Sequence, residues 1–73
     1  MQILLYELRK KSKLTQKEIA DELGISRQNY GKKERSELPF DQDEMFRISE
    51  FFNKDIDEIF LPRTYQFGNK QKI

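Results

Sequence analysis

The chain has 73 residues, among them 14 Lys or Arg and 13 Asp or Glu, and a formal net charge of +1. This length suits one small domain, and the absence of Cys and His excludes disulfides, the usual zinc sites and a histidine general base. No apolar stretch is long enough to span a membrane, and the run Ile3–Leu5 is too short for a signal peptide. We therefore expect a cytoplasmic protein without a metal or other cofactor.

The charges are unevenly distributed along the chain. Residues 9–35 contain nine Lys or Arg against four Asp or Glu, whereas residues 36–60 contain two against eight. A basic half followed by an acidic half is compatible with one side of the molecule meeting a polyanion. Charge alone, however, favours an ordinary solvated surface of mixed sign.

Leucines at helical spacing predict a first helix over about residues 2–11. A second helix should follow Thr15, because Thr15 and Glu18 have the spacing of a capping box. Gly24 should end this helix, since glycine adopts the left-handed conformation at little cost. The inward face would consist of Ile19, Ala20 and Leu23.

The third predicted helix begins after Ser26, a favourable N-cap, and runs to about Arg35. Tyr30 is its only strongly apolar residue, so the helix would not be stable in isolation. Neighbouring helices must therefore hold it while it presents a polar face to a partner.

Two further helices complete the predicted domain. A capping box of Asp41 and Glu44 begins a fourth helix that ends near Phe52, and a short fifth helix follows Asp55. We take residues 1–62 as the folded domain, since Pro62 ends regular helix. For the polar segment 63–73, in which Tyr65 and Phe67 are two residues apart, we predict either a disordered tail or a short dimerisation strand.

The second and third helices, joined by Leu23-Gly24-Ile25-Ser26, have the spacing of a helix-turn-helix. Ala20 is small enough to let the helices cross closely, Gly24 makes the turn, and Tyr30 fills the space beneath. An ordinary corner between two helices has the same features, so this segment alone does not decide the function.

Several segments read together resemble the Cro/CI (XRE) repressor family over residues 3–61. They are Leu5-x-x-Leu8-Arg9, Leu14-Thr15-Gln16-x-Glu18-Ile19-Ala20-x-x-Leu23-Gly24-Ile25-Ser26, Glu34, and Ile48-x-x-x-Phe52-x-x-x-Ile56-Asp57-Glu58-Ile59-Phe60. The resemblance implies an all-α, five-helix, lambda-repressor-like DNA-binding domain, a double-stranded DNA operator as ligand, and a homodimer. The chain departs from the family at Lys33, which replaces an apolar residue, and at Ser36, which replaces a common glycine.

The resemblance also implies roles for individual residues. With the third helix in the major groove, we predict that Gln28 reads adenine and that Arg27 or Lys32 reads guanine. The predicted phosphate or groove contacts are Gln16, Lys17, Ser26, Asn29, Gly31, Lys33 and Arg35, with Lys13 adding nonspecific attraction. Gly31 would allow close approach to DNA. Arg9 and Glu34 match positions that form an internal ion pair in the family, so we assign them a structural role.

These features predict a sequence-specific transcriptional regulator of the phage or mobile-element type, acting as a repressor on a near-palindromic operator. The alternative is a protein-interaction module, such as an antitoxin, with a surface from the acidic region 36–60 and aromatic side chains. The candidate aromatic residues are Phe40, Phe46, Phe60, Tyr65 and Phe67, which could equally be core or dimer interface. An enzyme is disfavoured, because no catalytic base or metal set is apparent. No small-molecule ligand is indicated.

Overall fold

The computed structural model describes residues 1–60, and the predictions for residues 61–73, including the end of helix at Pro62 and the tail strand, lie outside this range. The described part contains five helices and no strand: α1 (Ile3–Lys11), α2 (Gln16–Leu23), α3 (Arg27–Glu34), α4 (Gln42–Phe52) and α5 (Ile56–Ile59). The predicted all-α, five-helix fold is therefore confirmed. Helix boundaries differ from the predicted ones by about one residue.

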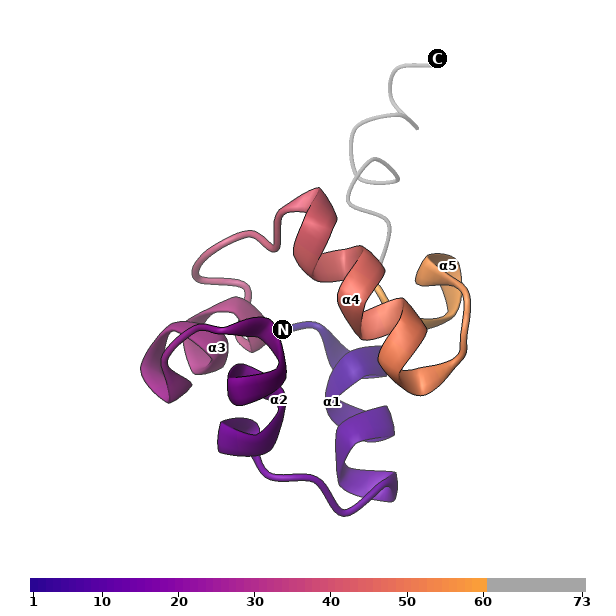
Figure 1. Cartoon of the computed structure of the whole chain (residues 1–73), viewed down its shortest axis with the longest axis horizontal. Coiled ribbons are helices and arrows are strands. Elements are labelled where there is room, and N and C mark those ends of the chain that lie inside the picture. Colours follow the sequence, from indigo (N-terminus) through magenta and orange to yellow (C-terminus); the bar gives the residue numbers. More distant parts are fainter. Residues whose placement is uncertain (61–73) are drawn as a thin grey trace.

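The helices are arranged so that α2 and α3 form one side of the molecule and α5 lies on the other (Figure 1). Helix α2 packs most extensively against α3, while α1 contacts both α3 and α5. Helix α4 contacts α2 and α5 and so closes the bundle. This arrangement holds the polar helix α3 at the edge of the domain, as its composition requires.

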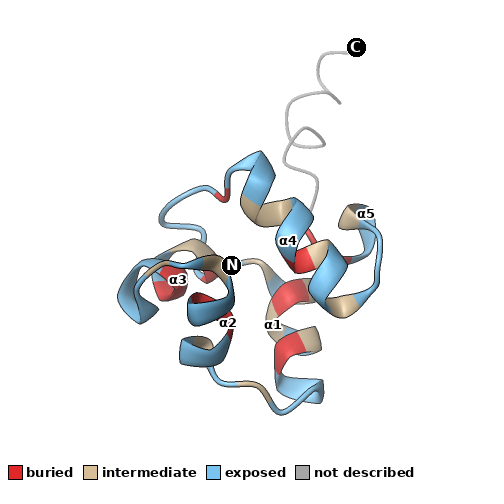
Figure 2. Cartoon of the chain, viewed as in Figure 1, coloured by how far each residue is buried: buried red, intermediate tan, exposed pale blue. Residues whose placement is uncertain are grey.

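Buried residues lie on the parts of the helices that face the interior of the molecule (Figure 2). The hydrophobic core consists of Leu5, Ile19, Ala20, Tyr30, Phe40, Ile48, Ile59 and Phe60. Phe40 lies in the loop before α4, yet its ring packs edge-on against both Tyr30 and Phe60. Two of the aromatic residues considered for a protein-binding surface, Phe40 and Phe60, are thus core residues, whereas Phe46 is half exposed.

The helix starts follow the local sequence signals. The Thr15 hydroxyl accepts a hydrogen bond from the Glu18 amide at 3.1 Å, and the Glu18 carboxylate accepts one from the Thr15 amide at 2.8 Å. The corresponding reciprocal bonds join Asp41 and Glu44 at the start of α4. Ser26 caps α3 by accepting from the Asn29 amide at 3.1 Å. Each predicted cap of these three helices is confirmed.

Four helices end in the same way, with a residue in the left-handed conformation just after the last turn. The four residues are Lys13 (φ 60°), Gly24 (φ 73°), Ser36 (φ 68°) and Asn53 (φ 56°). In each case backbone amides fold back onto carbonyls of the last turn, as in a Schellman motif. Gly24 alone adopts this conformation without a steric penalty, which amounts to about 1–2 kcal/mol for most other residues.

Replacing Ser36 with Gly is expected to raise the free energy of unfolding by about 0.5–1 kcal/mol. Glycine relieves most of the left-handed penalty, and this gain exceeds the loss caused by the larger conformational entropy of glycine in the unfolded chain. Chemical denaturation of the variant measures the effect. Ser12→Gly is the matched control, since Ser12 has a φ of −83° and no strain to relieve. Equal changes in the two variants would show that the left-handed backbone at Ser36 is not strained.

Candidate nucleic-acid interface

Helix α3 presents a polar face to solvent and buries the opposite one. Arg27, Gln28 and Lys32, the residues predicted to read bases, are all exposed, whereas Tyr30 and Glu34 are buried. The α2–α3 pair has the predicted Gly24 turn, and its ends are held by the caps described above. The exposed face of α3 is therefore free to enter a groove, and the individual base contacts remain predictions.

A buried polar network fixes α3 against the first two helices. The Glu34 carboxylate accepts hydrogen bonds from Arg9 Nε at 2.8 Å, Arg9 Nη2 at 3.2 Å, Tyr30 OH at 2.8 Å and Gln16 Nε2 at 3.0 Å. Arg9 Nη1 also donates to the Leu14 carbonyl at 2.9 Å. The ion pair that the resemblance implies is thus present, and its side chains are only 8% and 1% exposed.

This network keeps Glu34 ionised. Burial would raise the pKa of Glu34, but hydrogen bonds from Arg9, Gln16 and Tyr30, with the charge of Arg9, hold it below its usual value. The hydrogen bond to Glu34 raises the pKa of Arg9 against the opposing effect of burial. Burial, together with the nearby Glu34 charge, raises the pKa of Tyr30. The phenol therefore stays protonated and serves as a donor.

The side chain of Gln16, a predicted phosphate contact, is joined to the buried network through its amide nitrogen. Its Nε2 donates to Glu34, while its Oε1 lies above Gly31, 3.5 Å from where a Cβ on that glycine would stand. Arg35 Nη1 lies 3.2 Å from the same point. Gly31 is therefore buried beneath two side chains, for which it makes room. A direct contact between Gly31 and DNA would require Arg35 to move.

Three of the cations predicted to contact phosphate form ion pairs with acidic residues of the same chain. Lys17 and Arg35 do so on the surface, with Asp21 and Glu37 respectively. Lys33 differs, because its ammonium lies 2.7 Å from Glu44 Oε1 and both side chains are largely buried.

In this geometry the Lys33 ammonium, predicted to contact phosphate or a groove, is directed to α4 and away from the exposed face of α3. The ammonium also donates to the Pro39 carbonyl at 3.3 Å and lies over the Phe40 ring. A lysine fits at this usually apolar position because α4 supplies a carboxylate to pair with it. Lys33 joins α3 to α4 and faces away from the polar surface of α3.

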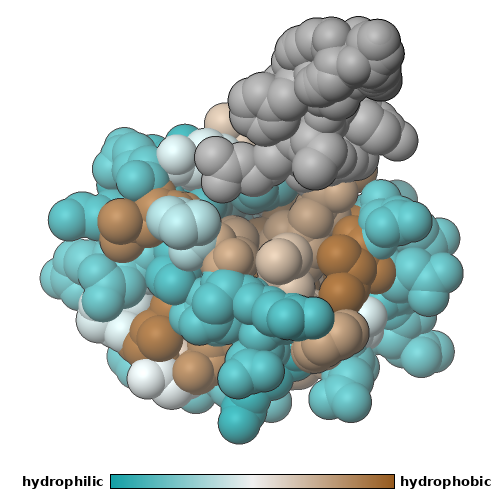
Figure 3. Space-filling view, turned by 90° about the horizontal axis from the view of Figure 1, so that it is seen from above, coloured by the Kyte–Doolittle hydropathy of each residue, from teal (hydrophilic) through white to brown (hydrophobic). Residues whose placement is uncertain are grey.

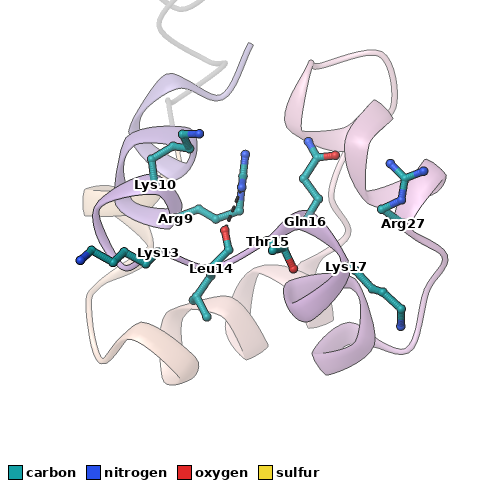
Figure 4. Close-up of a pocket in the computed structure, with 8 residues that line it drawn as sticks. All are labelled: Arg9, Lys10, Lys13, Leu14, Thr15, Gln16, Lys17 and Arg27. Atoms are coloured by element: carbon teal, nitrogen blue, oxygen red, sulfur yellow. Dashed lines mark hydrogen bonds between the residues drawn. The ribbon is translucent and has the colours of Figure 1, made fainter.

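A basic cleft lies beside α3, at the start of α2 (Figure 4). It is an open cleft of about 620 Å³ lined by Arg9, Lys10, Lys13, Leu14, Thr15, Gln16, Lys17 and Arg27. Five of these residues are cationic and none is acidic. The cations come from both sides, with Lys10 on α1 and Arg27 on α3, while Lys13 and Lys17 extend outward at the edges. An anion here would meet positive charge from three segments.

Sequence reasoning did not identify Lys10 or Thr15 as part of a site. Lys10 belongs to a run of three cations, Arg9 to Lys11, in which nothing local distinguishes one from another. In the fold, Arg9 is buried in the network, Lys10 lines the cleft, and Lys11 lies on the other side of α1 near α5. The helical periodicity of α1 orients these side chains, but its packing partners decide what each one meets.

Comparison with known protein families gives a match. A family model described as helix-turn-helix matches residues 5–59, which include all of α2, α3 and the turn between them. The chain belongs to the Cro/CI-type (XRE) helix-turn-helix family. The protein is accordingly a DNA-binding transcriptional regulator. Comparison with curated proteins and with solved structures gives no match.

Residues 1–60 of the regulator contain neither a membrane-spanning helix nor a cluster of metal ligands. Across residues 1–60, no helix combines the length and apolar character needed to cross a bilayer. Over the same residues, no group of three or more potential ligands is placed to hold a metal ion. The exposed polar face of α3 and the adjoining basic cleft are the two features of the described residues that suit an anionic partner.

Proposed function

We propose that this regulator is a cytoplasmic, phage-repressor-like transcriptional repressor that binds a near-palindromic operator as a homodimer. The observation that supports this most directly is the exposed polar face of α3 beside a cleft lined by five cations. In this docking mode, two subunits place their third helices in successive major grooves. Residues 1–62 form the DNA-binding domain in this proposal, with 63–73 as a tail.

The basic cleft is proposed to hold a DNA phosphate. A helix N-terminus attracts anions, and the amides of Gln16 and Lys17 precede the first capped amide of α2, that of Glu18. Lys10 would flank the same phosphate and Lys13 would add positive charge at the edge of the cleft, while Arg27, on the α3 side, is assigned to base reading. Because such contacts are made with any sequence, they position the protein and contribute no base selectivity.

Base reading is assigned to the exposed residues of α3. Gln28 can make paired hydrogen bonds with adenine N6 and N7, and Arg27 or Lys32 can donate to guanine O6 and N7. Ser26 and Asn29 lie at the first turn of the same helix, where groove or phosphate contacts are made. The Ser26 oxygen already accepts a bond from the Asn29 amide, so the hydroxyl would contact DNA as a donor.

Gln28→Ala is expected to weaken binding to the preferred duplex by about 5- to 150-fold, the loss of one bidentate base contact. The preferred duplex comes from selection in a random library near physiological salt, because phosphate contacts dominate when salt is low. Fluorescence titration then compares it with a scrambled duplex, whose affinity should change far less. Gln42→Ala, an exposed glutamine at the start of α4, is the matched control.

The same selection tests the proposal against its alternative. Enrichment of a near-palindrome, bound by two subunits per duplex, would support a sequence-reading dimer. Equal weak affinity for all duplexes would overturn the proposal and favour a protein-binding module.

The observation that favours a protein-binding module is the exposure of Phe46 and Phe51 on α4, whose exposed fractions are 50% and 42%. Figure 3 shows hydrophobic side chains lying among hydrophilic ones on one face of the molecule.

A further inference from the structure

The turn after α3 places a carboxylate back against the end of that helix. Ser36 adopts the left-handed conformation, and the Glu37 amide then donates to the Lys32 carbonyl at 2.8 Å. The Ser36 amide donates to the Lys33 carbonyl at 3.1 Å, which completes the Schellman motif. These two hydrogen bonds fix the backbone of Glu37 next to the last turn of α3.

The side chain of Glu37 binds Arg35 through two hydrogen bonds. Arg35 Nε lies 2.9 Å from Glu37 Oε2, and Arg35 Nη2 lies 3.3 Å from Glu37 Oε1. A fork of this kind matches the geometry with which arginine binds a phosphate, so one guanidinium edge cannot serve both groups at once. Glu37 therefore occupies the Nε–Nη2 edge of Arg35, one of the two edges with which this guanidinium could bind a DNA phosphate.

The other end of the guanidinium lies across the middle of α3. Arg35 Nη1 is within 3.2 Å of the Cβ position of Gly31, beside Gln16. This nitrogen donates no hydrogen bond within the described residues 1–60. The pair with Glu37 thus holds Arg35 against the helix that is proposed to enter the groove, with one nitrogen left for a ligand.

We propose that Glu37 is a specificity-determining residue, which holds Arg35 over Gly31 and denies its forked edge to the phosphates of non-cognate DNA. This inference rests on the proposed function. Both side chains are about half exposed, so the pair is weak enough to exchange and strong enough to bias where Arg35 lies. On the preferred duplex, Arg35 keeps its place and contributes through Nη1. On other duplexes, Glu37 competes with phosphate for the guanidinium.

Glu37→Gln is expected to raise affinity for the scrambled duplex roughly 2- to 5-fold, with no comparable gain on the preferred duplex. The ratio of the two affinities should fall accordingly. The salt dependence of scrambled-duplex binding should steepen by about one phosphate contact, because Arg35 becomes available to the backbone. The thermal midpoint should stay near that of the unmodified protein, which separates this effect from a loss of folding.

Glu7→Gln provides the charge-matched control. Glu7 lies on α1 in a groove shared with Lys54 and Glu58 near α5, away from α3, and its loss changes the net charge equally. Equal gains on both duplexes, or the same effect in both variants, would overturn the inference, since Glu37 would then act only through net charge. Failure of the proposed function looks different, because the unmodified protein would itself bind the two duplexes equally.

Discussion

Replacing Arg9 with Met is expected to lower the free energy of unfolding by about 3–5 kcal/mol, because it leaves a buried carboxylate without its charged partner. Glu34 is 1% exposed and would retain only the donors on Tyr30 and Gln16. A domain of this size has a total stability on the order of 5–10 kcal/mol, so a large fraction of the variant would unfold on mild heating. The Leu14 carbonyl, which anchors the start of α2, would lose its partner as well.

Urea denaturation measures this loss, and Lys11→Met is its control. Lys11→Met removes one positive charge from the same helix, as Arg9→Met does, but Lys11 is exposed. Its replacement should therefore change the stability by about 0.5 kcal/mol or less. A similar small change in both variants would show that the Arg9–Glu34 pair contributes nothing to folding. In that case the placement of α3 would depend on hydrophobic contacts alone.

The pH dependence of the same two proteins provides a second measure. The pKa of Glu34 is lower in the folded protein than its ordinary value of 4.5. Its stabilising contribution is therefore fully present above that value and is lost as the pH falls through the lowered folded pKa. In Arg9→Met the lowering should shrink, since Arg9 supplies the strongest favourable hydrogen bonds. The stabilities of the two proteins should accordingly converge in acid and diverge toward neutral pH.

Replacing Phe40 with Ala is expected to destabilise the domain by about 3–5 kcal/mol, although Phe40 belongs to no helix. Its ring is 9% exposed and packs edge-on against Tyr30, at 6.1 Å between centroids, and against Phe60, at 5.2 Å. Aromatic pairs of this geometry add to the free energy of simple burial. The ring also lies 5.9 Å below the Lys33 ammonium, so its loss would weaken the link from α3 to α4.

Thermal and urea unfolding of Phe40→Ala should be compared with Leu38→Ala, a truncation in the same loop. Leu38 is 39% exposed, so we expect its replacement to cost about 1 kcal/mol or less. If both variants lost similar amounts of stability, the loop would contribute through its backbone rather than through the Phe40 ring. Stability of Phe40→Ala equal to that of the unmodified protein would mean that the core closes without the loop.

Local sequence signals predicted the helices because capping acts over three or four residues. Thr15 with Glu18, Asp41 with Glu44, and Ser26 each form the expected bonds. Signals of this short range cannot show which distant side chains cover a residue. From the sequence, Gly31 inside α3 was predicted to allow close approach to DNA. Gly31 is covered instead by Arg35 and by Gln16, which is 15 positions away along the chain.

The DNA-facing surface was only partly predictable, for a related reason. The exposed face of α3 follows from helical periodicity around the one apolar residue, Tyr30, so its members could be named from the sequence. Which cations remain available to an anion depends on their partners in space. Lys33 pairs with Glu44 across 11 positions, whereas Lys10 and Arg27 meet at one cleft from opposite sides. No local pattern distinguishes these cations from one another.

By itself, the sequence determined the helical class, the helix-turn-helix, the caps and the family, because each is written in residues close together or in a repeated apolar spacing. Tertiary structure alone decided that Glu34 joins three helices, that the basic cleft forms, and that Glu37 holds Arg35 against α3. Hydrogen bonds and ion pairs are short-ranged and directional. Their partners are therefore chosen only once packing of the core has fixed the distances between the helices.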